Sequence, residues 1–430
     1  MSILKYTRDH ISSLLELISK LKQSEFPYYS SFLALEKIEE RFKTHLLNLE
    51  DLEFVNEATL TLCRQIMAEV CNVLPILGFI LRSTNVRNAF EMYSPLLRLV
   101  RTILGDDKKI ILSSEWEYSP YTYRLLPFKE LSEYILIGFP ASESDNPLLL
   151  PLSGHEIGHH VWRVMDDSNN LIKFRQEIEN TIINLIYKKQ RDFISLFPNI
   201  NCDIFKHEFD VFKNEVRQDT SIDSIITNIC LITLKQLEEI FCDFFGLYLF
   251  KESFIFAFVY SLSPGIMVTR NIGYPDIYDR IKYLEFAAKK MGIYISEDFK
   301  SYFERQEYPS DPYNKFYLEL ADDITEKFIL NLIDLVIEYT KNKRLPEYKH
   351  ENVEEIFDLF KNKLSPIIKP YSLIEILNAG WKCYLEINSW KNRFINHWNF
   401  KKRREILKEL ILKSIEILEI YTRLKEKNDS

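Results

Sequence analysis

Apolar residues recur every three or four positions along most of this chain, and that spacing restricts most of it to α-helices. Near the amino terminus the pattern of a helix with one buried face is carried by Ile11, Leu14, Leu15, Ile18 and Leu21. Only 10 glycines stand against 30 phenylalanines and 24 tyrosines, which favours long helices packed through bulky side chains over glycine-rich barrels or repeats. We therefore predict a mainly helical protein.

Two short stretches interrupt the helical pattern and predict a small β-sheet. Both are rich in Ile, Leu and aromatic residues, and they span 109–114 and 133–139. The expected fold is mainly α with a small sheet (α+β). It is divided into an N-terminal helical region (1–104), a core (105–300) and a C-terminal helical region (301–430). Within the core, helices are expected at 148–163, 169–197, 203–250 and 277–290, with a Pro/Gly-punctuated loop at 263–275.

Charge and composition exclude several classes of protein. The 55 basic and 63 acidic residues give a net charge of −8, which argues against a nucleic-acid-binding surface. The charged amino terminus does not have the pattern of a signal peptide, and the apolar stretch 253–268 is shorter than the roughly 20 residues of a membrane span. The six scattered cysteines indicate reduced thiols. We expect a soluble cytoplasmic protein.

The segment His155-Glu156-Ile157-Gly158-His159 is an HExxH motif near the start of a predicted helix, with Ser153 as the expected cap. Residues four apart share a helix face, so the two imidazoles would lie about 6 Å apart and could bind one ion. Glu156 would emerge beside that face, where it could take a proton from a metal-bound water. Two ordinary surface or capped histidines are the alternative interpretation.

A catalytic zinc needs a third protein ligand. The longer motif HExxHxxGxxH, which supplies a third histidine, is not present. Trp162 stands where it requires glycine, and Met165 stands where it requires histidine. A later apolar run, 237–246, contains acidic side chains that would be unstable if buried without a partner. Glu239 is therefore predicted to bind zinc, and Asp243, one turn later on the same face, is predicted to contact a ligand histidine.

HEIGH followed by EIFCD resembles the HExxH…ExxxD pattern of gluzincin metallopeptidases, including the soluble relatives of the HtpX and prenyl-protease clan. The resemblance covers mainly residues 152–165 and 239–283, within what would be a metallopeptidase-like core. It implies His155, His159 and Glu239 as zinc ligands, with Glu156 as the general base and Asp243 as the partner of His155. Two further residues on this segment are given no role at the metal: Glu238, assigned to solvent or a salt bridge, and Cys242, a small core residue where the family usually has alanine.

The segment 274–281 resembles the HPxxxxRI sequence of the same clan, with Tyr274 in place of histidine. The resemblance implies that Tyr274 could donate a hydrogen bond to the tetrahedral oxyanion. It implies that Arg280 could anchor the loop, contact substrate or pair with an acidic neighbour. A buried tyrosine at a helix start and a surface arginine are the alternative.

Together these features predict a zinc-dependent peptidase that hydrolyses peptide or protein substrates with a zinc-activated water and Glu156 as the base. A protein that keeps zinc for structure and acts as a binding or regulatory module is the first alternative. A metal-dependent hydrolase of a non-peptide bond is the second. A structural zinc is closed by four protein ligands, whereas a catalytic zinc keeps a position for water, so the ligand set distinguishes these functions.

Overall fold

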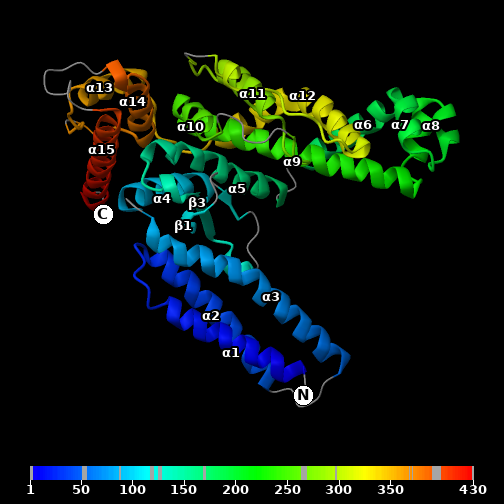
Figure 1. The fold of residues 1–430 in the computed structure, drawn as a ribbon, viewed down its shortest axis with the longest axis horizontal. Coiled ribbons are helices and arrows are strands. Elements are labelled where there is room, and N and C mark those ends of the chain that lie inside the picture. The colour runs from blue at the N-terminus through cyan, green and yellow to red at the C-terminus, as the bar shows by residue number, and fades with distance from the viewer. Residues whose placement is uncertain are drawn as a thin grey trace. The chain divides into compact units, whose positions relative to one another are not determined.

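The computed structural model describes residues 3–50, 56–86, 89–116, 121–123, 128–167, 171–262, 269–295, 298–367, 369, 371–389 and 399–428. The protein is mainly helical (76%), and its described residues form fifteen α-helices and one three-stranded sheet (Figure 1). This confirms the predicted fold class. The chain divides into two compact units, residues 1–156 with 345–430 and residues 157–344. The predicted division at 104 and 300 stays a prediction.

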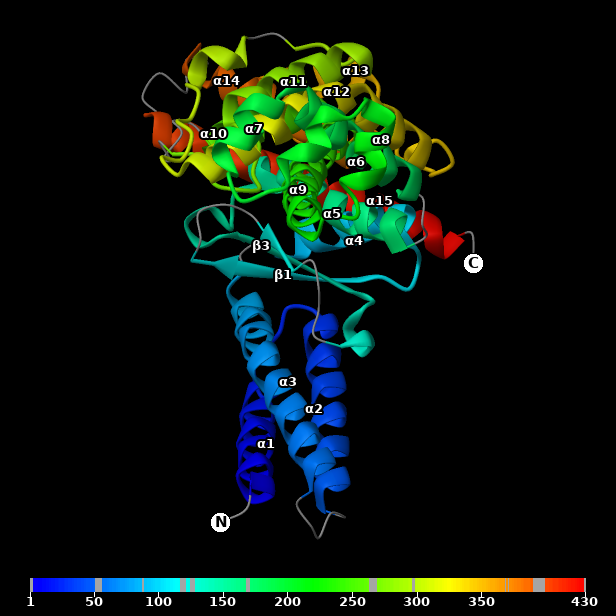
Figure 2. The same ribbon diagram turned by 90° about the vertical axis from the view of Figure 1, so that its right-hand side faces the viewer.

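The first unit begins with three long helices that pack side by side (Figure 2). They are α1 (Ile3–Leu21), α2 (Tyr29–Glu50) and α3 (Glu57–Arg82). In α1 the buried residues follow the predicted spacing and include Ile11, Leu14 and Ile18. The start of α3 is capped by Asn56, whose side-chain oxygen accepts a hydrogen bond from the Thr59 amide at 2.8 Å.

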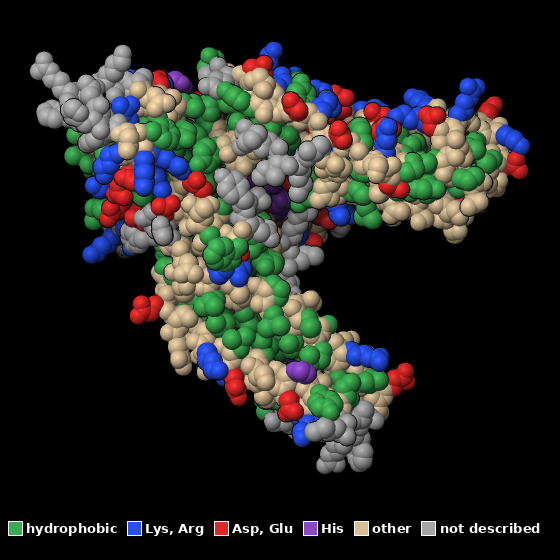
Figure 3. Space-filling model, viewed as in Figure 1, with side chains coloured by type: hydrophobic (Ala, Val, Ile, Leu, Met, Phe, Trp, Pro, Cys, Tyr) green, Lys and Arg blue, Asp and Glu red, His purple; other side chains and the backbone are tan. Residues whose placement is uncertain are grey.

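Helix α3 and the turn after it, Glu57–Asn85, are long and apolar enough to cross a bilayer by length and composition. Of the most apolar 18-residue stretch within this segment, 44% is buried inside the protein. The space-filling view shows further hydrophobic side chains on the surface of the α1–α3 bundle (Figure 3), and Leu74 and Leu81 of α3 are exposed. Because the core helix of a soluble protein meets the same criteria, this one helix is weak evidence for a membrane.

The sheet follows α4 (Ala89–Leu104), which ends at Gly105 in a positive-φ conformation that favours glycine. The two predicted strands are confirmed as β1 (Lys109–Glu115) and β3 (Tyr134–Pro140), and the structure shows that they pair in parallel. The short β2 (Tyr121–Thr122), which was not predicted, pairs antiparallel with β3. Every residue of β3 is buried, and β3 lies between β1 and β2, so it is the central strand of the described sheet.

The first unit is completed by three helices from the end of the chain, α13 (His350–Lys361), α14 (Leu373–Leu385) and α15 (Phe400–Asn428). Helix α14 supports a buried 3₁₀ turn, η4 (Pro147–Leu152), that precedes the HExxH motif. The Trp381 indole donates a hydrogen bond to the Leu148 carbonyl at 2.8 Å. A Cβ atom added to Gly380 would lie 2.7 Å from Ile411 and 3.3 Å from Leu148, so α14 packs closely on both.

The second unit is entirely helical in its described residues apart from loops and one isolated β-bridge. Helix α9 (Thr220–Phe250) is buried on almost every face in its second half. It packs against four helices, α6 (Ile172–Lys188), α10 (Glu252–Leu262), α11 (Ile277–Lys290) and α12 (Pro312–Thr340). The predicted helix at 277–290 is confirmed as α11, whereas those at 169–197 and 203–250 are broken near Lys189 and before Thr220. The other helices are α5 (Ser153–Asp167, where the two units divide), α7 (Gln190–Leu196) and α8 (Phe209–Glu215).

Candidate metal centre

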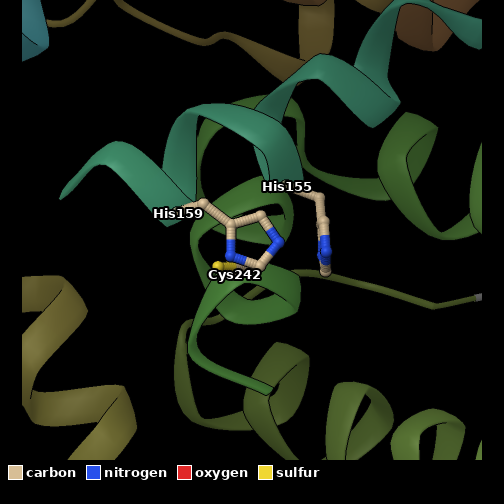
Figure 4. A group of neighbouring side chains, drawn as sticks. All are labelled: His155, His159 and Cys242. Carbon is tan, nitrogen blue, oxygen red and sulfur yellow. The ribbon is translucent and has the colours of Figure 1, made fainter. Parts of the chain in front are cut away.

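Helix α5 carries the HExxH motif and begins at Ser153. Ser153 does not cap it as predicted, because its φ of −58° and ψ of −23° are helical and its hydroxyl donates to the Leu150 carbonyl at 2.7 Å. The buried turn η4 leads directly into α5 and fixes its first residue instead. His155 is half-buried and His159 is buried, and both project from α5 toward α9 (Figure 4).

A third donor comes from α9. Three donor atoms lie within 4.8 Å of one another: one ring nitrogen of His155, one ring nitrogen of His159 and the sulfur of Cys242 (Figure 4). Imidazole and thiolate are the usual ligands of zinc in proteins. These three side chains therefore form a group that could hold a metal ion.

Close contact between the two helices brings the three donors together. A Cβ atom placed on Gly158 would lie only 2.8 Å from the Cα atom of Cys242 and 3.2 Å from its sulfur. Real Cβ atoms do not approach a backbone atom so closely, so a glycine is required where α5 crosses α9. The glycine inside the HEIGH motif therefore sets the separation of the helices at the candidate site.

Two neighbouring carboxylates of α9 lie on either side of the His159 ring. Glu238 Oε1 is 2.8 Å from Nδ1, and Glu239 Oε1 is 3.8 Å from Nε2. Ligand atoms bound to one tetrahedral zinc are about 3.3–3.7 Å apart, and the distance between Glu239 Oε1 and His159 Nε2, 3.8 Å, is slightly longer than this range. Glu238, assigned from the sequence to solvent or a salt bridge, thus contacts a histidine of the motif.

Glu156, the predicted base, is buried on α5 with 5% of its surface exposed. Its position next to His155 in the chain places it in the first turn of the helix that carries both histidines. The proton-accepting role predicted for it stays a prediction.

Asp243 and Arg280 form a buried, doubly hydrogen-bonded ion pair. Arg280 Nε and Nη2 donate to the two oxygens of Asp243 at 2.8 and 2.7 Å. The Nη2 atom also lies 3.9 Å from Glu239, and the guanidinium stacks on Phe258 at 4.9 Å. Arg280 therefore pairs with an acidic neighbour, one of the roles that the sequence allowed. The predicted contact of Asp243 with His155 stays a prediction.

The charges around Arg280 keep it protonated. Burial lowers the pKa of its guanidinium, but Asp243, Glu239 and Tyr274 together outweigh burial and raise it above its ordinary value. A permanent positive charge thus lies beside the predicted carboxylate ligand.

Tyr274 lies in the loop before α11, and 46% of its surface is exposed. The loop is held by Arg270, a buried residue whose Nε donates to the Tyr274 carbonyl at 3.1 Å. Arg270 is itself paired with Asp322 of α12. The first part of the predicted loop, residues 263–268, lies outside the described residues.

Sequence reasoning missed Cys242 and Glu238 as residues of the site. The sequence predicts Cys242 as a small core residue; it is buried, and its sulfur lies within 4.8 Å of a ring nitrogen of each histidine of the motif. The sequence contains a signal for Cys242. Its thiol is a common zinc ligand, and it lies one helical turn after Glu239, the residue predicted to bind zinc. All six cysteines lie in the described residues, and none is joined in a disulfide.

Comparisons with protein-family models, with curated proteins and with solved structures gave no match for this chain. The resemblance to gluzincins therefore rests on the motifs alone. The geometry defines a mainly helical protein with a His155/His159/Cys242 group that could hold a metal ion.

Proposed function

We propose that the protein is a zinc-dependent hydrolase that cleaves peptide bonds in peptide or protein substrates. The observation that carries the proposal is the convergence of His155, His159 and Cys242 within 4.8 Å, with the buried Glu156 in the same helix. Nitrogen and sulfur donors favour zinc over magnesium or calcium, which prefer oxygen. All six cysteines are in the described residues and none is in a disulfide, which is typical of a reducing compartment, so the proposal includes the cytoplasm.

His155 and His159 would hold the metal together with Glu239, Cys242 or both. Three protein ligands leave a position for water, and four close the site. Glu239 is supported by its distance of 3.8 Å from His159 Nε2, and Cys242 by its place in the three-residue group.

Bound zinc would supply a Lewis acid that lowers the pKa of a bound water to about 7. Glu156 would accept the proton of that water and return it to the leaving amine. The Tyr274 hydroxyl would donate a hydrogen bond to the developing oxyanion. Arg280, which is oriented by Asp243, would stabilise the ionised form of Glu239.

A non-catalytic zinc protein is the second candidate, and Cys242 is the observation that favours it. With Cys242 and Glu239 both bound, the four protein ligands would leave no position for water. The same donor set could alternatively serve hydrolysis of a non-peptide bond.

The test is zinc analysis and a peptide-library cleavage assay on the wild type and on His155→Ala, His159→Ala and Glu156→Gln. We expect about one zinc per chain in the wild type and in Glu156→Gln, and loss of most zinc in the two alanine variants. Glu156→Gln should lose hydrolysis, because an amide cannot accept the proton of water.

Full cleavage by Glu156→Gln would remove the proposed mechanism. Zinc without cleavage by the wild type, combined with sulfur and three other protein ligands in X-ray absorption spectra, would favour the non-catalytic function. As a matched control, His207→Ala changes an exposed histidine and should alter neither zinc content nor cleavage.

A further inference from the structure

The His159 ring has a different acidic partner at each nitrogen. Glu238 contacts Nδ1 at 2.8 Å, and Glu239 lies near Nε2 at 3.8 Å. The side chains of His159, Glu238 and Glu239 are 6%, 15% and 5% exposed, so water is largely kept from these contacts. An ionised carboxylate only accepts hydrogen bonds, so the nitrogen that contacts Glu238 at hydrogen-bonding distance must carry a proton.

We propose that Glu238 is a positioning residue that fixes His159 as the tautomer with its proton on Nδ1. Nε2 then keeps its lone pair and is the nitrogen that binds the metal. This role rests on the proposed metal site. It gives Glu238 and Glu239 different tasks, since Glu238 orients the ring and Glu239 lies on the side where the metal would bind.

Two consecutive helix residues rarely contact the same ring, because their side chains leave the helix about 100° apart. Here the close crossing of α5 and α9 at Gly158 and Cys242 brings the ring of His159 against α9. The ring can then reach both carboxylates. The acidic pair Glu238-Glu239 therefore has a physical reason to occupy this turn of α9.

A carboxylate hydrogen-bonded to the second nitrogen of a ligand histidine fixes the ring and increases its basicity. Removing such a partner usually weakens metal binding by about 10- to 100-fold. A simple surface ion pair would contribute little to metal affinity and would not select one ring nitrogen. The two roles of Glu238 therefore differ in a property that can be measured.

The first measurement is the tautomer of His159 in the full-length, metal-free protein with ¹⁵N-labelled histidine, at a pH where the ring is neutral. The wild type should show a protonated Nδ1 and an unprotonated Nε2. This preference should persist in Glu238→Gln, whose amide oxygen can still accept the hydrogen bond, and disappear in Glu238→Leu. A wild-type proton on Nε2 would overturn the proposal.

The second measurement is zinc affinity. Glu238→Gln should bind within about threefold of the wild type, and Glu238→Leu about 10- to 100-fold more weakly. Glu285→Leu is the matched control, because Glu285 on α11 has a similarly buried carboxylate, 18% exposed, paired with Lys300. Equal affinity of Glu238→Leu and the wild type would overturn the positioning role.

The two measurements separate this inference from the proposed function. A wild type that binds no zinc but has the expected tautomer would contradict the metal site and leave the orientation of His159 by Glu238 supported. Zinc binding through His159 Nδ1, detected as ¹¹³Cd–¹⁵N coupling in the cadmium-loaded protein, would contradict the positioning role and leave the metal site supported.

Discussion

At the scale of single residues, the missing side chain of Gly158 matters as much as the donors around it. An alanine there would place its Cβ 2.8 Å from the Cα of Cys242, so α5 and α9 would have to move apart. We expect Gly158→Ala to lower the free energy of unfolding by about 1–3 kcal/mol. We also expect zinc binding to weaken about tenfold or more, because the donors of the two helices would separate. Urea unfolding and zinc titration measure the two effects.

Gly78→Ala is the control for this substitution. Gly78 is also inside a helix, α3, but a Cβ there would meet only the flexible end of Arg82 at 3.1 Å. This variant should be as stable as the wild type or up to about 1 kcal/mol more stable, with unchanged zinc affinity. Unchanged zinc affinity in Gly158→Ala as well would show that the crossing tolerates a wider separation.

The sequence could predict His155, Glu156 and His159 because their relation depends only on the repeat of one helix. It offered Cys242 only as a possible ligand type, and it could not show that Cys242 and Glu238 meet the histidines, because they do so only where α5 crosses α9. A crossing depends on the rotation and register of two helices that are far apart in the chain. For Glu239 and Asp243 the sequence predicts only that a buried carboxylate needs a partner. The structure identifies the partners, which include His159 for Glu239 and Arg280 for Asp243.

At the scale of helices, α15 is held to α4 by a buried charge. Glu419 is 1% exposed and pairs with Arg98 of α4 and with Arg423 on its own helix. Burial by itself raises the pKa of Glu419, but the hydrogen bonds from the two arginines outweigh burial and lower it. A lowered pKa in the folded state means that ionised Glu419 stabilises the fold above its unfolded pKa of about 4.3. This stability is lost as the pH falls through the lower, folded pKa.

We therefore expect Glu419→Gln to lower the free energy of unfolding at pH 7 by about 1–3 kcal/mol. The difference from the wild type should shrink as the pH falls below the unfolded pKa of about 4.3 and through the lower pKa of the native carboxylate. Urea unfolding at pH 7, 5 and 3.5 measures the difference. Glu416→Gln, an exposed position on the same helix, should have little effect. A difference that stays constant over this pH range would contradict the stabilising role of the ionised carboxylate.

The helices themselves were largely predictable, and their interruptions were not. The run 277–290 matched α11 because Asp276 caps its start and Lys289 and Lys290 close its end, all within one local segment. The predicted helix 203–250 is broken where Asp219 caps the start of α9, a local signal that the continuous apolar pattern concealed. The strand β2 is only two residues long, too short for any periodic pattern to reveal.

At the scale of the whole molecule, a ligand that binds only the folded state must stabilise it. Zinc at 100 times its Kd would add about 2.7 kcal/mol, which corresponds to a rise of several °C in Tm. Calorimetry with and without zinc measures this rise. The wild type and Glu156→Gln should show it, and His155→Ala and His159→Ala should not. An equal rise in the alanine variants would place the zinc elsewhere in the protein.

Because α14 supports η4, the start of α5 gains this contact only late in synthesis. Leu148, just before the HExxH motif, is held by Trp381, and all of residues 157–344 are synthesised between the two. At about 5–20 residues per second, a ribosome needs roughly 12–47 s to add the 233 residues from Leu148 to Trp381. During this interval the six apolar residues of η4, all buried in the finished protein, have left the ribosome without the helix that covers them. We therefore expect the newly made chain to expose this apolar turn until α14 has been synthesised.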